Sequence, residues 1–245
     1  MNKKDNIFNN DSIKDFDFVF DKNVVSVFDD MINRSIPFYK EMQDLIVYFC
    51  DSILDNDFKL LDLGCSLGNT LFNIAEKSKK ENFELIGIDS SIEMIEEANK
   101  RKSLLYPRKN INFFKSEINN ALFLDFKNND AIISSLTLQF IRPIERQSIV
   151  NNIFTSLNED GIFILIEKTI LNESSLNRFF IDRYYRFKKD NGYSETEIHK
   201  KRLSLENVLV PFSNNENISL LNNAGFKDVE LFFQWLNFSC YIAKK

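Results

Sequence analysis

Short apolar runs alternate with amphipathic stretches along most of the chain. Five apolar runs have the length of buried strands: FKLLDLG (58–64), FELIGID (83–89), INFFKSEI (111–118), DAIISSL (130–136) and GIFILIEK (161–168). Apolar residues recur at helical spacing in five other segments, about 22–34, 37–54, 69–80, 92–101 and 143–157. Strands that alternate with helices predict an α/β fold with a doubly wound, mostly parallel sheet.

The two ends of the chain depart from this alternation. Residues 1–20 are polar with scattered Phe, which predicts a loose arm. Residues 172–225 have a mostly helical and polar pattern. FKDVELFFQ (226–234) and LNFSCYIAKK (236–245) alternate as an antiparallel strand pair, which brings the sheet to seven strands. We therefore expect a single domain of four parts: an N-terminal helical cap (1–57), a ligand-binding core (58–169), a helical insertion (170–225) and a C-terminal strand pair (226–245).

Local signals give the expected element boundaries. Pro37 and Pro143 each fit the first position of a helix, where the missing N–H has no partner to lose. NEDG (158–161) is expected to form the turn that ends the preceding helix. The ligand crevice of a doubly wound sheet lies beyond the carboxyl ends of its strands. The functional residues are therefore expected just after positions 63, 88, 117 and 134.

Composition narrows the class of protein. The 245 residues are 44% hydrophobic and 27% charged, which excludes a fibrous or wholly disordered chain. The net charge is −5, which makes nucleic acid a poor candidate for a direct partner. Three widely spaced cysteines favour a reduced compartment and argue against a disulfide framework or a four-ligand zinc site. No apolar run reaches the roughly 18 residues of a membrane span, and the N-terminus lacks a signal-peptide core. These features predict a soluble cytoplasmic protein without a metal.

The loop D-L-G-C-S-L-G-N (62–69), which joins a strand to a helix, carries the clearest chemical signal. One interpretation is a hydrolase nucleophile elbow with Ser66 as the nucleophile, but the only histidine, His199, lies in a polar helical stretch. A nicotinamide dinucleotide loop would need a Gly that is absent here. The pattern D-x-G-x-x-x-G is instead similar to the first motif of class I S-adenosylmethionine enzymes, whose ligand lacks phosphates.

Side chains at the other strand ends fit such a nucleoside ligand. Asp89 is placed to accept hydrogen bonds from both ribose hydroxyls, although it can also serve as a helix N-cap. Glu117 and Ile118 are placed to flank the adenine, and Ser135 to line the crevice under the sulfonium. The alternatives are a solvated Glu at a loop start and ordinary turn chemistry at Ser135.

Several longer segments together resemble the carboxy-S-adenosyl-L-methionine synthases. They are FVFDKNVVSVFDDMINRSIPFY (18–39), LDLGCSLGN (61–69), IGIDSSIEMIE (86–96), LTLQFIRPIERQ (136–147), NGYSETEIHKKRLSLENVL (191–209) and AGFKDVELFFQWLNF (224–238). The resemblance implies a Rossmann-like class I methyltransferase fold. It also implies conversion of S-adenosyl-L-methionine and prephenate to carboxy-S-adenosyl-L-methionine and phenylpyruvate, a homodimer, and delivery of the product to a tRNA carboxymethyltransferase that modifies the wobble uridine.

The resemblance also implies a set of ligand-binding residues and assigns no catalytic residue. Tyr39 contacts the ligand from the N-terminal cap, and Arg202 binds the carboxylate added to the methyl carbon. Ser90 and Ser135 stand where the family commonly has Asn, and Glu117 stands where it commonly has Asp. The full implied set is Tyr39, Gly64, Cys65, Ser66, Asp89, Ser90, Glu117, Ile118, Ser135 and Arg202.

Two other functions share this loop and fold. A conventional S-adenosylmethionine-dependent methyltransferase acting on a small acid or an RNA base has no use for a carboxylate clamp such as Arg202. A non-catalytic subunit that binds the ligand would tolerate the changes at Glu117 and Ser135. Without the resemblance, Arg202 in the KKR run (200–202) would be taken for part of a solvated basic helix face.

Overall fold

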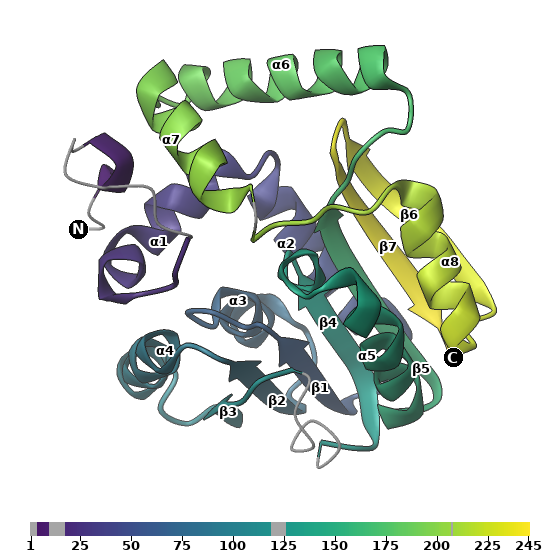
Figure 1. The fold of residues 1–245 in the computed structure, drawn as a ribbon. Helices are drawn as coiled ribbons and strands as arrows, with labels where there is room; N and C mark the ends of the chain where they lie inside the picture. Colours follow the sequence, from purple (N-terminus) through teal and green to yellow (C-terminus); the bar gives the residue numbers. More distant parts are fainter. Residues whose placement is uncertain (1–3, 10–17, 119–125, 207) are drawn as a thin grey trace.

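The computed structural model describes residues 4–9, 18–118, 126–206 and 208–245. Seven strands form one sheet in the order β3-β2-β1-β4-β5-β7-β6 (Figure 1). The strands are β1 (Asp57–Leu63), β2 (Asn82–Asp89), β3 (Ile111–Lys115), β4 (Asn129–Ser135), β5 (Leu157–Lys168), β6 (Asp228–Trp235) and β7 (Phe238–Lys244). The first five are parallel, whereas β7 runs antiparallel to both β5 and β6. The predicted fold class is confirmed.

Helices cover both faces of the sheet. The helices are α1 (Lys22–Ser35), α2 (Tyr39–Ile53), α3 (Asn69–Lys77), α4 (Ile92–Leu105), α5 (Pro143–Ser156), α6 (Ser174–Asp190), α7 (Glu195–Leu205) and α8 (Asn214–Ala224), with short 3₁₀ turns at Ile7–Asn9 and Leu138–Phe140. Residues of α2, α3 and α4 pack on one face, against alternate strand positions such as Leu60 and Ile133. Residues of α5 and α8 pack on the other, against Leu61 and Phe163. Because both faces are buried, the central strands are almost continuously apolar, as their sequences indicated.

Two expected boundaries are wrong. Helix α2 begins at Tyr39 rather than Pro37, because Phe38 takes a left-handed conformation with φ of 55° and interrupts the helical path. Residues 158–161 are not a turn between helix and strand but an irregular part of β5, which begins at Leu157. Leu157 pairs with Asn129 of β4, pairing resumes with Ile162 opposite Ala131, and Asp160 between them has a φ of 64°. The side-chain amide of Asn129 donates to the Ser156 carbonyl at 3.2 Å and so fixes the end of α5 at this point. Pro143 opens α5 as expected.

The segment treated as one helical insertion occupies two places. Helix α8 packs beside α5 on the sheet, whereas α6 and α7 lie over the carboxyl ends of the strands (Figure 1). The Tyr184 hydroxyl of α6 donates to the Ser35 carbonyl at the end of α1, at 3.0 Å. The Phe18 N–H donates to the Ser204 carbonyl of α7, also at 3.0 Å. Helices α6 and α7 therefore form, with α1, a cover above the sheet edge.

One glycine lets the first loop lie against the fourth strand. Gly64 follows β1 with φ of 73°, and a Cβ at this position would lie 2.4 Å from the Thr137 side chain. Thr137 follows β4 and donates to the Ser135 carbonyl at 3.1 Å. The close approach of the two loops thus requires a residue without a side chain at position 64.

Gly64→Ala is expected to lower the free energy of unfolding by about 2 kcal/mol or more, because it combines backbone strain with a side-chain clash. Gly192→Ala is the matched control: Gly192 has φ of 86°, but no heavy atom lies within 4 Å of the position that a Cβ would take. Only the backbone cost of about 1 kcal/mol is therefore expected for the control. Denaturant unfolding of both variants measures the difference. Equal losses would contradict the role assigned to the contact with Thr137.

Candidate functional site

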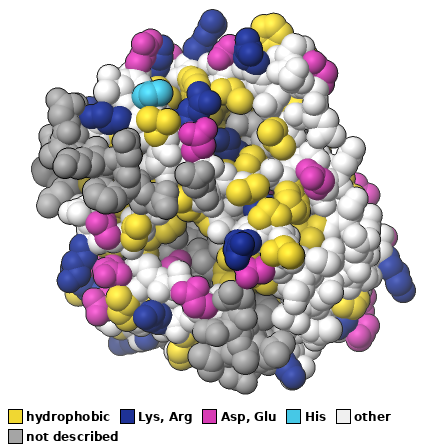
Figure 2. Space-filling model, in the orientation of Figure 1, with side chains coloured by type: hydrophobic (Ala, Val, Ile, Leu, Met, Phe, Trp, Pro, Cys, Tyr) yellow, Lys and Arg dark blue, Asp and Glu magenta, His cyan; other side chains and the backbone are white. Residues whose placement is uncertain are grey.

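A cavity of about 560 Å³ lies at the carboxyl edge of the sheet, beneath the cover formed by α1, α6 and α7. Its volume falls in the range typical of small-molecule sites. Figure 2 shows hydrophobic side chains gathered around a hollow on this face, between α7 and α5. The ten residues predicted from the sequence all line this cavity: Tyr39, Gly64, Cys65, Ser66, Asp89, Ser90, Glu117, Ile118, Ser135 and Arg202. Their individual roles toward a ligand stay predictions.

The loop after β1 is fastened to the end of β2. The N–H groups of Gly64 and Cys65 both donate to the Ile88 carbonyl, at 2.8 and 3.0 Å. The Ser66 N–H donates to Asp89 Oδ2 at 2.9 Å. These bonds hold the loop open toward the cavity with Ser66 at a positive φ of 48°.

Asp89 connects this loop to the start of α4. Its second oxygen, Oδ1, accepts from the Ser91 N–H at 2.9 Å. The N-cap of α4 is Ser91, whose hydroxyl oxygen accepts from the Met94 N–H at 3.2 Å. Burial raises the pKa of the Asp89 carboxyl, and its backbone hydrogen bonds oppose that shift. Simple helix capping therefore does not account for Asp89, and its carboxylate lies at the cavity wall with lone pairs left for a ligand.

Asp62 adds a second carboxyl group to this wall. It lies in β1, is 2% exposed, and lines the cavity. Burial raises its pKa to about 7, and the nearby charge of Asp89 adds to the effect. Asp62 was not among the site residues predicted from the sequence, where it served only as the acid of the D-x-G pattern. That acidic position was the signal that could have identified it.

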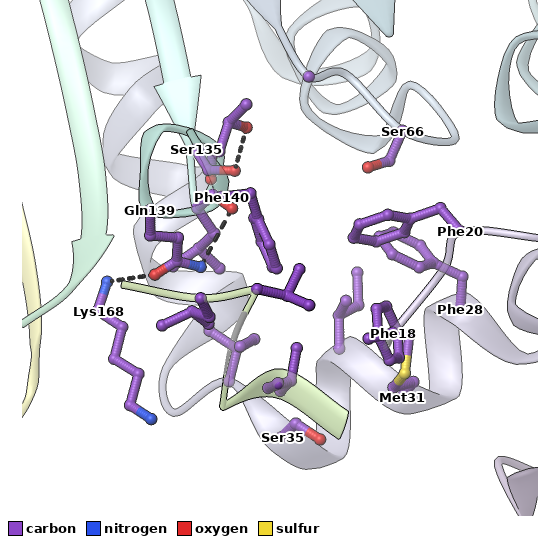
Figure 3. A pocket seen from close by; sticks show the side chains of 18 of the residues that line it. Phe18, Phe20, Phe28, Met31, Ser35, Ser66, Ser135, Gln139, Phe140 and Lys168 are labelled. Carbon is purple, nitrogen blue, oxygen red and sulfur yellow. Dashed lines mark hydrogen bonds between the residues drawn. The ribbon is translucent and has the colours of Figure 1, made fainter. Parts of the chain in front are cut away.

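Aromatic side chains form a further part of the cavity wall that was not predicted from the sequence. Phe18, Phe20 and Phe28 group with Met31 on one side, and Phe140 lies across from them (Figure 3). The rings of Phe20 and Phe140 meet edge to face, with centroids 5.7 Å apart. Such faces are suited to a planar base and to a sulfonium cation. Their sequence signal was only a high Phe content, which does not separate cavity rings from core rings.

The side of the cavity formed by the cover is basic. Lys168 at the end of β5, Lys188 on α6, and Lys201 and Arg202 on α7 line it. Burial lowers the pKa of Lys168 to about 8, and the neighbouring Arg202 charge adds to the shift. Burial also lowers the pKa of Lys201 to about 8 and holds the pKa of Lys188 well below its ordinary value. Arg202 is exposed at the cavity and forms no salt bridge among the described residues.

The remaining predicted residues differ in exposure. Cys65 is buried beneath the loop, and burial raises the pKa of its thiol well above the ordinary value. Tyr39 is partly buried at the start of α2, and burial raises the pKa of its hydroxyl. Glu117 is exposed and Ile118 is buried, just beyond the end of β3. This pair therefore presents one polar and one apolar side chain at the cavity, the arrangement expected for an adenine site.

Two kinds of feature are absent from the described part of the chain. Across residues 4–9, 18–118, 126–206 and 208–245, no cluster of three or more His, Cys, Asp or Glu is arranged to hold a metal ion. Within the same ranges, no helix has both the length and the apolarity needed to cross a bilayer.

The fold and the loop define the class of protein. A seven-stranded doubly wound sheet, with a Gly loop after β1 and a carboxylate at the end of β2, is the arrangement of S-adenosylmethionine-dependent methyltransferases. Residues 54–208 match a family described as a methyltransferase domain. The structure is similar to a putative S-adenosyl-L-methionine-dependent methyltransferase from Methanococcus maripaludis, with a TM-score of 0.61 and 18% identity over 96% of this chain and 97% of that one.

Sequence relatives identify the family within this class. The chain is 46% identical to a carboxy-S-adenosyl-L-methionine synthase of Nautilia profundicola over 99% of this chain and 100% of the relative. It is 45% identical to the synthase of the same name from Campylobacter hominis, with the same coverage. The chain belongs to the carboxy-S-adenosyl-L-methionine synthase family, and the resemblance found in the sequence is confirmed. It is accordingly an enzyme of the transferase type.

Asp89→Ala is expected to weaken S-adenosylmethionine binding by roughly 1.5–3 kcal/mol, the loss of hydrogen bonds to a charged group. Ser91→Ala is the matched control, because it removes the cap of α4, at a cost of about 1 kcal/mol in stability, and keeps the carboxylate. Isothermal titration measures both affinities. The Ser91 hydroxyl also donates to the Phe20 carbonyl at 2.9 Å. If Ser91→Ala weakens binding as much as Asp89→Ala, the placement of α4 and Phe20 accounts for the loss and Asp89 is not a ligand residue.

Asp62→Asn is expected to stabilise the ligand-free protein progressively as the pH rises. The Asp62 pKa is 3.8 ordinarily and about 7 in the fold. Between these values the folded chain holds a proton that the unfolded chain does not, so the contribution of Asp62 to stability falls with rising pH and is constant above about 7. Asn does not ionise, so the variant does not lose stability in this way as the pH rises.

The free energy of unfolding of Asp62→Asn, relative to that of the parent, should therefore increase from pH 4 to 7 and then level off. Urea unfolding at several pH values measures it, with Asp57→Asn at the exposed start of the same strand as the control for removal of one carboxylate. A gain that is independent of pH would contradict the burial effect.

Proposed function

We propose that the chain converts S-adenosyl-L-methionine and prephenate to carboxy-S-adenosyl-L-methionine and phenylpyruvate. The observation that carries the proposal is the division of one cavity into a carboxylate-bearing wall at the sheet edge and a basic wall in the cover. The carboxylate-bearing wall suits the ribose and the sulfonium of S-adenosyl-L-methionine. The basic wall suits a dicarboxylic acid and a carboxylated product, which a plain methyl transfer does not require.

The proposed reaction is balanced without a further reagent. Prephenate loses its ring carboxylate as carbon dioxide and its ring hydroxyl as hydroxide, and the ring becomes aromatic. The hydroxide takes a proton from the methyl group on sulfur, and the resulting carbanion forms a bond to the carbon dioxide. A sulfonium cation and a dianion thus give a zwitterionic product, the phenylpyruvate monoanion and water. The protein's tasks are to orient the two substrates and to exclude bulk water.

The residues of the cavity wall are assigned roles in this reaction by position. Asp89 and Ser90 hold the ribose, and Glu117 with Ile118 borders the adenine. The segment Gly64–Ser66 faces the methionine portion, with Tyr39 above it, and Ser135 lines the crevice near the sulfonium. Arg202 receives the new carboxylate, because a guanidinium forms paired hydrogen bonds with that group.

We further propose that the enzyme acts as a homodimer in the cytoplasm, and that a tRNA carboxymethyltransferase uses its product to modify the wobble uridine. The net charge of −5 supports a division of labour in which this chain makes the small molecule and does not itself hold the RNA.

Incubation of the purified protein with S-adenosylmethionine and prephenate is expected to give two products that mass spectrometry resolves. One should be heavier than S-adenosylmethionine by about 44 mass units, the mass of the added carbon dioxide, and the other should be phenylpyruvate. Carbon-13 in the ring carboxylate of prephenate should appear in the heavier nucleoside. Transfer of an unmodified methyl group to an acid or an RNA base, with no gain in mass, would instead favour a conventional methyltransferase.

A further inference from the structure

Three lysine side chains enter the cavity from different elements of the fold. Lys168 comes from the end of β5, Lys188 from α6 and Lys201 from α7. Figure 3 shows the Lys168 side chain extending along the cavity from its backbone, whose N–H bonds to Gln139. Lys188 is 6% exposed and Lys201 is 8% exposed. Lysines are almost never buried this deeply unless an anion is paired with them.

No carboxylate in the described part of the chain pairs directly with these lysines. Within the described residues, none of the three lysines forms a salt bridge. The ammonium groups of Lys188 and Lys168 lie 4.8 and 5.4 Å from the centroid of the Tyr184 ring. The ammonium of Lys201 donates only a long hydrogen bond, 3.4 Å, to the Ser35 hydroxyl. These contacts orient the lysines but bring no negative charge to them, which agrees with the lowered pKa of all three ammonium groups.

The nearest opposing carboxylate is already engaged. Asp5 attracts both Lys188 and Lys201, but its Oδ2 accepts from the Tyr193 hydroxyl at 2.5 Å and its Oδ1 from the Ile7 N–H at 3.2 Å. The single charge of Asp5 is therefore shared between Lys188 and Lys201, and it does not act on Lys168. An arrangement of like charges in a poorly solvated place is unfavourable by itself, and a bound anion would relieve it.

The reaction supplies anions of two kinds. The carboxylate that leaves prephenate must be free to reach the methyl carbon, whereas the carboxylate of the pyruvyl side chain is unchanged and remains in phenylpyruvate. A carboxylate that stays on the molecule can anchor it, whereas one that leaves cannot. The two carboxylates of prephenate therefore need separate subsites.

We propose that Lys168, Lys188 and Lys201 form the subsite that anchors the retained carboxylate of the dicarboxylic second substrate, next to Arg202, which receives the other carboxylate. The inference rests on the proposed function for the identity of the acid. Binding of the retained carboxylate orients the ring so that the departing carbon dioxide is released toward the methyl group, and Arg202 meets that carboxylate after it has moved.

The test uses Lys168→Gln, Lys188→Gln and Lys201→Gln, each of which removes a charge and keeps a long polar side chain. Lys189→Gln is the matched control, since Lys189 follows Lys188 on α6 but is paired with Glu195 on the outside. The readouts are KM for each substrate and the affinity of prephenate for protein loaded with S-adenosylhomocysteine, which permits no turnover.

Each lysine variant is expected to raise KM for prephenate and to lower its affinity, both by about tenfold to a hundredfold. This is the effect of losing one hydrogen bond to a charged group. KM for S-adenosylmethionine should stay within about twofold, and Lys189→Gln should match the parent. Phenylpyruvate, which keeps the same carboxylate, should compete with prephenate, and the same variants should weaken that competition. The unfolding temperature should stay constant or rise, because an unpaired buried charge has been removed.

The two hypotheses fail in different ways. If the parent makes carboxylated product and the three variants bind prephenate like Lys189→Gln, the lysine subsite is wrong and the proposed function stands. If the parent makes no such product but the lysine variants still lose affinity for prephenate, the subsite stands and the proposed reaction is wrong. A fall in unfolding temperature with unchanged prephenate affinity would assign the lysines to the fold alone. Three variants from three elements ensure that the misfolding of one does not decide the outcome.

Discussion

Opposite charges on facing walls of one cavity are the physical constraint on which the rest of this structure depends. Asp62 and Asp89 lie at the sheet edge, and Lys168, Lys188 and Lys201 lie in or beside the cover. Each group is held in a poorly solvated place, where charges interact more strongly than in water. A ligand pair with a cation toward the sheet and carboxylates toward the cover relieves both walls at once. The proposed pair of substrates has this distribution of charge, whereas a neutral acceptor would leave the basic wall without a partner.

Local sequence signals located much of the half of the site that belongs to the sheet, although they did not identify Asp62 as a site residue. The pattern D-L-G-C-S-L-G-N identified the loop, and the acid after the second apolar run identified Asp89. Strand order then determines what lies together, because the parallel strands β1, β2, β3 and β4 end at the same edge. Glu117 and Ser135 reach the cavity for that reason, although neither belongs to a distinctive local motif.

The basic wall was not predictable in the same way, because it depends on how α6 and α7 cross the sheet edge. Lys188 and Lys189 are neighbours in sequence, yet one is buried in the cavity and the other pairs with Glu195 outside. Lys188 lies with Tyr184 on the buried face of α6, but a lysine is normally exposed, so the sequence gives no reason to place it inside. The start of α2 was misplaced for a related reason, since the left-handed Phe38 is not visible in the hydrophobic spacing.

Helix α1 joins the two walls. On one side the Asp29 carboxylate accepts from Asn69 of α3 and Arg101 of α4, both at 2.9 Å. On the other, the Ser35 carbonyl accepts from Tyr184 of α6. Because α1 is bonded to both the sheet helices and the cover, the position of the lysines is fixed relative to that of Asp89. The proposed reaction, in which carbon dioxide passes between two bound molecules, needs such a fixed relation, since any gap that admitted water would offer the carbanion a competing proton.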